Sequence, residues 1–141
     1  MREIIFRGKR KDNGEWVYGD LYHAWSWIYT KPDIKIANNM GKFPVIPETV
    51  GQYTGLTDKN GKKIFEGDIV TFGQNVYQIT FECGSFSLLD SEGRMITKIG
   101  GINDYCYSFQ RLYDECMWED GWAYDIEIIG NIHDNPELLE K

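Results

Sequence analysis

Apolar residues gather in two stretches near the start of the chain, residues 2–7 and 15–22. Stretches of this length bounded by turn residues are typical of β-strands. The polar run Lys11-Asp12-Asn13-Gly14 lies between them, and Asn-Gly readily adopts the positive φ angles of a type I′ turn. We therefore predict an N-terminal β-hairpin.

Three large aromatic residues follow at alternate positions. Trp25, Trp27 and Tyr29 are separated by single residues, Ser26 and Ile28. Because side chains alternate between the two faces of a strand, one face would present all three aromatics. Such a stripe is either part of the core or a contact surface.

The next stretch, residues 30–47, is dense in residues that interrupt regular structure. It predicts a loop with at most a short strand at residues 34–36. We place the internal boundary here, between an N-terminal β subdomain at residues 1–48 and a barrel-like subdomain at residues 49–141, unless the two form one continuous domain. The interrupting residues are Pro32, Asn38, Asn39, Gly41, Pro44 and Pro47.

The remainder of the chain contains strand-length runs separated by turn residues. Short strands at this spacing are typical of a meander that curls into a barrel. A β-branched, alternating run at residues 124–132 would supply the closing strand. The other expected strands are residues 49–53, 69–72, 76–82, 85–89 and 95–99.

Residues 102–122 fit either a helix or a strand. Within them Phe109, Leu112, Tyr113 and Cys116 follow the i, i+3, i+4, i+7 pattern, which favours a short helix at residues 108–117. A second helix of about one turn is predicted after an N-cap, a first-turn proline and an acid. Those three residues are Asn135, Pro136 and Glu137.

The predicted fold class is therefore mainly β. It consists of an N-terminal β-hairpin subdomain and a small SH3-like or meander β-barrel. One or two short helices are expected near the C-terminus.

Charge is distributed unevenly along the chain. The formal net charge is −7, which disfavours non-specific attraction to nucleic acid or anionic lipid. Residues 1–11 are rich in Lys and Arg, whereas residues 112–140 contain acids and neither Lys nor Arg. Two interpretations stay open: two ordinary solvated faces, or attraction between the basic start and the acidic end, within one chain or between subunits.

No residues form a recognisable catalytic, cofactor or metal site, and we expect none. Cys83, Cys106 and Cys116 lack disulfide or C-x-x-C spacing, which indicates reduced thiols in a cytoplasm. Neither Cys106 nor Cys116 has zinc-ligand spacing to His133. We expect no membrane insertion, because no apolar run approaches the roughly 18 residues that span a bilayer.

Nucleic-acid binding is an alternative function. Lys59, Lys62 and Lys63 make a basic turn, and the stripe of Trp25, Trp27 and Tyr29 could stack on bases. The net acidity and the need for aromatic residues in the core weigh against this interpretation.

Three blocks of sequence resemble the YopX family, and together they cover nearly the whole chain. The resemblance implies a mostly β phage or prophage protein of bacteria without an established biochemical activity, and no catalytic residue can be carried over from it. The blocks are Arg7-Gly8 with Gly14-Glu15-Trp16-Val17-Tyr18-Gly19; Thr49 to Leu56 with Asp58-Lys59-Asn60-Gly61 and Ile64 to Val70; and Ile129-Gly130-Asn131-Ile132 through Asn135-Pro136-Glu137-Leu138-Leu139.

The central block also makes sense as folding information. Its glycines are expected to lie in turns. We also expect the carboxylates of Asp58, Glu66 and Asp68 to accept hydrogen bonds from backbone N–H groups at those turns. Glu66 and Asp68 would otherwise be the only compact carboxylate pair entering a strand.

The function expected from these observations is a non-enzymatic protein–protein interaction or self-assembling module. Its expected partners are further copies of itself, or a protein of the bacterial host or phage. The alternatives are the nucleic-acid-associated module and, ranked last, an acidic decoy of a host nucleic-acid-binding protein.

Overall fold

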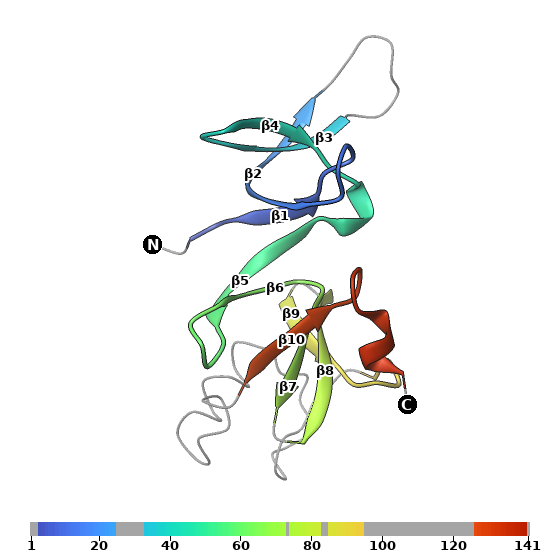
Figure 1. The fold of residues 1–141 in the computed structure, drawn as a ribbon. Helices are drawn as coiled ribbons and strands as arrows, with labels where there is room; N and C mark the ends of the chain where they lie inside the picture. The colour runs from blue at the N-terminus through green and yellow to red at the C-terminus, as the bar shows by residue number, and fades with distance from the viewer. Residues whose placement is uncertain (1–2, 25–32, 73, 83–84, 95–125, 141) are drawn as a thin grey trace. The chain divides into compact units, whose positions relative to one another are not determined.

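The computed structural model of the chain describes residues 3–24, 33–72, 74–82, 85–94 and 126–140 (Figure 1). The predicted stripe at residues 25–29, the predicted strand at 95–99 and the predicted helix at 108–117 lie outside these residues. The described residues form antiparallel strands joined by turns, which confirms the mainly β prediction.

The chain divides into two compact units, residues 1–55 and 56–141. The division falls within strand β5 (Gly51–Thr57), whereas we predicted a boundary ahead of that strand. The last residues of β5 belong to the second unit, in which β5 neighbours β6.

The first unit is an antiparallel sheet with the strand order β4-β3-β2-β1-β5. Its first two strands pair from Phe6 opposite Gly19 to Lys9 opposite Trp16, which confirms the N-terminal hairpin. The strands before β5 are β1 (Phe6–Lys9), β2 (Trp16–Ala24), β3 (Asp33–Asn38) and β4 (Gly41–Pro44), and a 3-10 turn η1 (Pro47–Thr49) precedes β5.

The loop of this hairpin differs from the type I′ turn that Asn13-Gly14 suggests. The N–H of Arg10 donates to the carbonyl of Glu15, and the N–H of Gly14 donates to the carbonyl of Arg10, both at 2.9 Å. Residues 11–14 therefore form the loop. Gly14 supplies its positive φ of 72°, which a residue with a side chain adopts at a cost.

The short strand allowed at residues 34–36 lies within β3, but the loop predicted for the rest of residues 33–44 was wrong, because these residues form the β3–β4 hairpin. Asn38 starts its turn by accepting a hydrogen bond from the N–H of Met40 at 2.8 Å. Pro44 ends β4, a strand at the edge of the sheet, where a missing N–H removes no ladder hydrogen bond. The breaker residues therefore occupy the turn and the edge of a hairpin rather than a loop.

The first unit curls so that the chain after β4 returns to the end of β1. Val45 forms a bridge with Arg10, and the N–H of Ile46 donates to the carbonyl of Lys9 at 2.8 Å. Val45, Val17 and Ile36 make the buried core of this unit. Gly8 lies against that core, where a Cβ would approach the Cβ of Val45 to 3.1 Å.

The second unit contains an antiparallel sheet with the strand order β10-β7-β8-β9. The last strand in the sequence thus pairs with β7, as a closing strand would. The buried apolar side chains of the second unit are Ile64, Phe65, Ile69, Val70, Ile79, Leu88 and Ile126. Its elements are β6 (Lys63–Phe65), β7 (Asp68–Phe72), β8 (Asn75–Glu82), β9 (Ser85–Leu89), β10 (Glu127–Asn131) and a 3-10 turn η3 (Pro136–Leu139).

The described C-terminal residues form a 3-10 turn rather than the predicted terminal helix. Pro136 takes the first position of η3, as expected, but the Asn135 side chain does not cap it. Its Oδ1 instead accepts a hydrogen bond from the N–H of Asn131 at 3.3 Å. Within the described residues the order of neither sheet closes into a barrel, so the SH3-like barrel stays a prediction.

Candidate functional site

Asp58 is a buried carboxylate with three backbone partners. Its side chain follows β5, and the residue is only 6% exposed. Oδ1 accepts hydrogen bonds from the N–H groups of Asn60 and Lys62, each at 2.9 Å, and Oδ2 accepts one from the N–H of Ile128 at 3.1 Å. The carboxylate therefore fixes its own turn and joins that turn to β10.

These contacts also set the acidity of Asp58. Burial by itself would raise the pKa of the carboxyl, because it removes the charged form from water. The hydrogen bonds from Ile128, Lys62 and Asn60, together with the positive charge of Lys62, outweigh burial and hold the pKa below its ordinary value. A carboxylate held in its charged form in this way is a poor general acid at neutral pH.

Asp68 is bound in the same manner at the start of β7. It is 2% exposed, and its Oδ2 accepts a hydrogen bond from the N–H of Phe65 at 2.7 Å. Gly67 beside it donates to Ile79 and accepts from Ile132 through its backbone. Glu66 is half-buried in the same turn. The turn therefore holds three strands together, and the geometry of Asp68 matches a structural role.

The three lysines that we considered for nucleic-acid binding lie in the β5–β6 turn and in β6. All three are exposed. Lys59 forms an ion pair with Glu127, with Nζ 3.2 Å from Oε2. The aromatic residues Trp25, Trp27 and Tyr29, with which we grouped these lysines, lie outside the described residues.

A different group of cations and aromatic residues lies on one face of the first unit. Strand β2 places Trp16, Tyr18 and Tyr22 on the same side of the sheet, because they occupy positions of equal parity. The register sets Lys9 opposite Trp16 and Arg7 opposite Tyr18. We call Arg7, Lys9, Trp16, Tyr18, Tyr22 and Lys42 the cation–aromatic face. Asp20 lies on the same side of β2, and Arg7 is buried, with 6% of its surface exposed.

Cations lie over the rings of this face. The guanidinium of Arg7 is 4.6 Å and the ammonium of Lys9 is 5.6 Å from the ring centroid of Trp16. The ammonium of Lys42 lies 4.2 Å from the ring centroid of Tyr22. Tyr18 and Tyr22 nevertheless remain 48% and 40% exposed. Sequence reasoning missed this face, although the alternation of aromatic residues along 16–22 was a signal for it.

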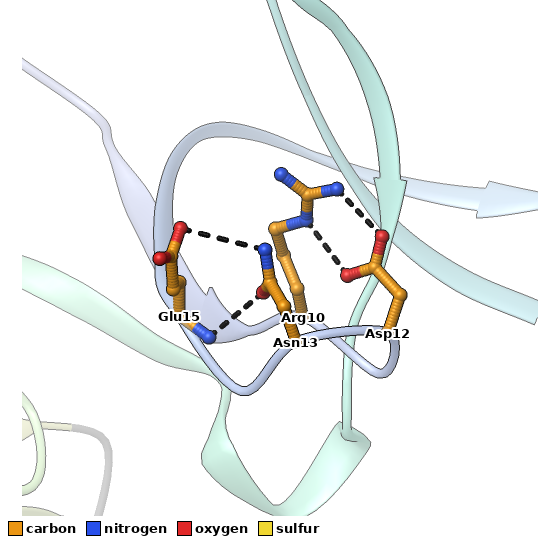
Figure 2. A network of polar contacts seen from close by, with 4 residues as sticks. All are labelled: Arg10, Asp12, Asn13 and Glu15. Carbon is orange, nitrogen blue, oxygen red and sulfur yellow. Dashed lines mark hydrogen bonds and ion pairs between the residues drawn. The ribbon is translucent and has the colours of Figure 1, made fainter.

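The loop that joins β1 and β2 is organised by its own polar side chains (Figure 2). The Arg10 guanidinium donates to both carboxylate oxygens of Asp12, from Nε at 2.9 Å and from Nη2 at 2.6 Å. This hydrogen bonding raises the pKa of Arg10 and lowers the pKa of Asp12. Asn13 Oδ1 accepts from the N–H of Glu15 at 2.9 Å. The network shapes an exposed loop and needs no ligand to explain it.

A cavity of about 420 Å³ lies in the second unit, at the β7–β8 turn and the turn after β9. Hydrogen bonds from Arg94 and Glu92 lower the pKa of Asp90 on its wall, the backbone N–H of Arg94 contributing most. Burial raises the pKa of Tyr77 beside it. Asp90 is thus tied to its turn, and the cavity holds no nucleophile paired with a base among the described residues.

Neither metal binding nor membrane insertion has a feature to support it in the described part of the chain. No three His, Cys, Asp or Glu side chains there are grouped so that they could hold a metal ion. Cys83, Cys106 and Cys116 lie outside that part. Among the described residues no helix is long and apolar enough to cross a membrane.

The two units carry opposite charge. Residues 1–55 contain eight Lys and Arg and six Asp and Glu, whereas residues 56–141 contain seven and sixteen. The first unit therefore has a formal charge of +2 and the second of −9. The asymmetry noted in the sequence follows the division of the structure.

The fold defines a mainly β protein of two antiparallel units, with its most buried carboxylates used to fix turns. Comparison with known families then identifies it: the chain belongs to the YopX family, whose description is "YopX protein" and which matches residues 5–140. The match spans both units and confirms the resemblance.

Among the solved structures that resemble this chain is one that covers nearly its whole length. Protein EF1440 from Enterococcus faecalis is 23% identical, with a TM-score of 0.52 over 99% of this chain and 100% of that one. At this identity the likeness concerns the fold. No curated protein matches the sequence.

Proposed function

We propose that this YopX-family protein is a non-enzymatic interaction module that assembles with further copies of itself. The observation that carries this proposal is the group of exposed side chains Tyr18, Tyr22 and Lys42 on a first unit of charge +2, in a chain whose second unit has charge −9. Tyr, Trp and Arg are enriched at protein interfaces, where they combine large contact area with specific polar groups.

The buried carboxylates support a role without catalysis. Asp58 and Asp68 both accept hydrogen bonds from backbone N–H groups, and these bonds keep the two side chains in fixed turns. General acid–base chemistry instead needs a group that can reach a substrate and exchange a proton. Their geometry therefore supports a scaffold that presents surfaces.

The family supplies the remaining parts of the proposal. As the YopX resemblance implies, we propose a phage or prophage origin and action in the bacterial cytoplasm, with a host or phage protein as a second type of partner. We also retain an SH3-like arrangement for the second unit. Its support is that three strands consecutive in sequence, β7, β8 and β9, form a meander.

Light scattering coupled to size exclusion tests self-association directly. We expect a discrete oligomer at about 50 mM salt that loses subunits at about 500 mM, because the Debye length falls from roughly 14 Å to 4 Å over this range. A monomer at both salt concentrations would contradict the proposal.

A nucleic-acid-associated role is the second candidate. Lys59 and Lys62 are exposed in the β5–β6 turn and Lys63 is exposed at the start of β6, which is the arrangement that favours it. Anisotropy of a labelled single-stranded oligonucleotide at about 50 mM salt tests this candidate, since phosphate contacts are strongest at low salt. No change in anisotropy up to high protein concentration would exclude it.

A further inference from the structure

We propose that Asn60 is a site of spontaneous chemical modification, at which the side-chain amide is converted to a carboxyl group and the backbone can be lengthened. The chemistry resides in the dipeptide Asn60-Gly61. Because Gly61 has no side chain, its backbone nitrogen can approach Cγ of Asn60 without steric hindrance. The assignment does not depend on whether the protein self-associates.

The reaction needs only water as a co-reactant. The backbone nitrogen of Gly61 loses its proton and attacks Cγ of Asn60, so that a C–N bond forms and the side-chain nitrogen leaves as ammonia. The product is a cyclic succinimide, which water opens at either of its two carbonyls. Opening at one carbonyl gives an aspartyl residue. Opening at the other gives an isoaspartyl residue, in which the backbone runs through Cβ and is longer by that methylene group.

The structure exposes the reacting groups. Asn60 and Gly61 are both exposed in the β5–β6 turn, and a Cβ added at Gly61 would meet no atom within 4 Å. The Asn60 side chain makes no hydrogen bond to another described residue. The N–H of Gly61 donates to the carbonyl of Asp58 at 3.0 Å, and this bond has to open before the nitrogen can react. We therefore expect the reaction to be slower in the folded protein than in the unfolded chain.

The sequence contains a second Asn-Gly pair, Asn13-Gly14, whose amide is held in place. Oδ1 of Asn13 accepts a hydrogen bond from the N–H of Glu15 at 2.9 Å, and Nδ2 donates to Oε2 of Glu15 at 3.4 Å (Figure 2). The N–H of Gly14 is bonded as well, to the carbonyl of Arg10 at 2.9 Å, so the glycine nitrogens do not distinguish the two pairs. The side chains do, because Asn13 can rotate only after its bonds break. We therefore assign the modification to Asn60.

A second turn shows which product the fold accommodates. The turn that begins at Asp90 has the same geometry as the turn that begins at Asp58. In each, the carboxylate Oδ1 accepts two backbone N–H groups at 2.9 Å, and the glycine three positions further on has a φ of 79°. Glu92 occupies in one turn the position that Asn60 occupies in the other. A carboxylate at this position is therefore compatible with the turn.

The two products should have opposite effects on stability. An aspartyl residue at position 60 leaves the backbone unchanged. An isoaspartyl residue adds a methylene group between the N–H groups of residues 60 and 62, which both donate to Oδ1 of Asp58. We expect it to raise the equilibrium constant of unfolding roughly five- to thirtyfold, which corresponds to the loss of one or two hydrogen bonds.

Ageing of the purified full-length protein in mildly alkaline buffer tests the assignment. Peptide mass spectrometry follows the exchange of amide for carboxyl at positions 60 and 13, and an isoaspartyl methyltransferase labels the isoaspartyl product. We expect position 60 to convert at least about fivefold faster than position 13, which is the difference that one hydrogen bond makes to a rate. In concentrated urea the two positions should convert at similar rates, because neither side chain is then held.

Asn60→Glu is the matched control. The longer side chain does not close the same ring, and Glu92 shows that the turn accommodates it, so this variant should keep the wild-type stability and form no isoaspartyl product at position 60.

The outcomes separate the site from its consequence. No conversion at position 60 in the folded protein, or conversion at position 13 that is equally fast, would overturn the assignment of the site. An isoaspartyl fraction that unfolds at the same urea concentration as unmodified protein would overturn the predicted loosening of the turn.

Discussion

Asp58 accepts a hydrogen bond from the backbone N–H of Ile128 at 3.1 Å, across 70 positions of the sequence. The neighbouring Lys59 N–H donates to the carbonyl of Ile126 at 2.8 Å, so two contacts hold this turn to the start of β10. The central block of the family sequence therefore meets the residues directly ahead of the C-terminal block. The turn that contains Asn60 and Gly61 must bring two backbone N–H groups, those of Asn60 and Lys62, to the same oxygen, Oδ1 of Asp58.

Replacement of Asp58 by Ala should destabilise the second unit by about 3 kcal/mol. Three backbone N–H groups would lose their acceptor, and each buried donor left without a partner costs about 1–3 kcal/mol, partly recovered by water. Urea unfolding followed by circular dichroism measures the change. Asp12→Ala is the matched control, because its carboxylate is exposed and its removal should change the stability little. An unchanged midpoint for Asp58→Ala would show that this turn is not structural.

The stability of the protein should fall in acid through the same carboxylate. The pKa of Asp58 is lower in the folded protein than in the unfolded chain, so its contribution is fully present above about pH 4 and is lost as the pH falls through the folded pKa. Asp90 also has a lowered pKa and adds to this dependence. Unfolding free energies measured between pH 7 and pH 3 should fall less steeply in Asp58→Asn than in the wild type. Equal slopes would mean that Asp58 titrates as it does in the unfolded chain.

Gly19 should tolerate no side chain. An added Cβ would lie 2.2 Å from the carbonyl oxygen of Ala37, and a backbone oxygen in a strand cannot move aside without breaking the β2–β3 pairing. We expect Gly19→Ala to cost about 3 kcal/mol, at the upper end of overpacking effects. Gly14→Ala is the control: it has open space, and its cost should be about 1 kcal/mol because only the positive φ opposes it. Similar melting temperatures for the two variants would contradict this difference.

Local patterns in the sequence identified the first hairpin and the mainly β class because both depend on turn residues and strand-length apolar runs. The β3–β4 hairpin was missed because Pro44 counts as a breaker in the sequence, whereas at the end of an edge strand it removes no hydrogen bond. The cation–aromatic face was missed for another reason. Which cations lie over Trp16 and Tyr22 depends on strand register, and no single segment of sequence contains that information.

The Gly130 and Asn135 positions should be energetically coupled. A Cβ at Gly130 would lie 2.6 Å from Oδ1 of Asn135, and that oxygen accepts a hydrogen bond from the N–H of Asn131. Gly130→Ala should therefore displace Asn135 and break the bond, at a cost of about 2 kcal/mol. Asn135→Ala loses the bond too but leaves room, so the double variant should be about 1 kcal/mol more stable than the sum of the single effects predicts. Urea unfolding of the four proteins completes this double-mutant cycle. Strict additivity would show that the Asn135 side chain is not the reason why position 130 requires glycine. The methyl group of Leu138, 2.9 Å from the same Cβ position, would then be the obstacle to a side chain.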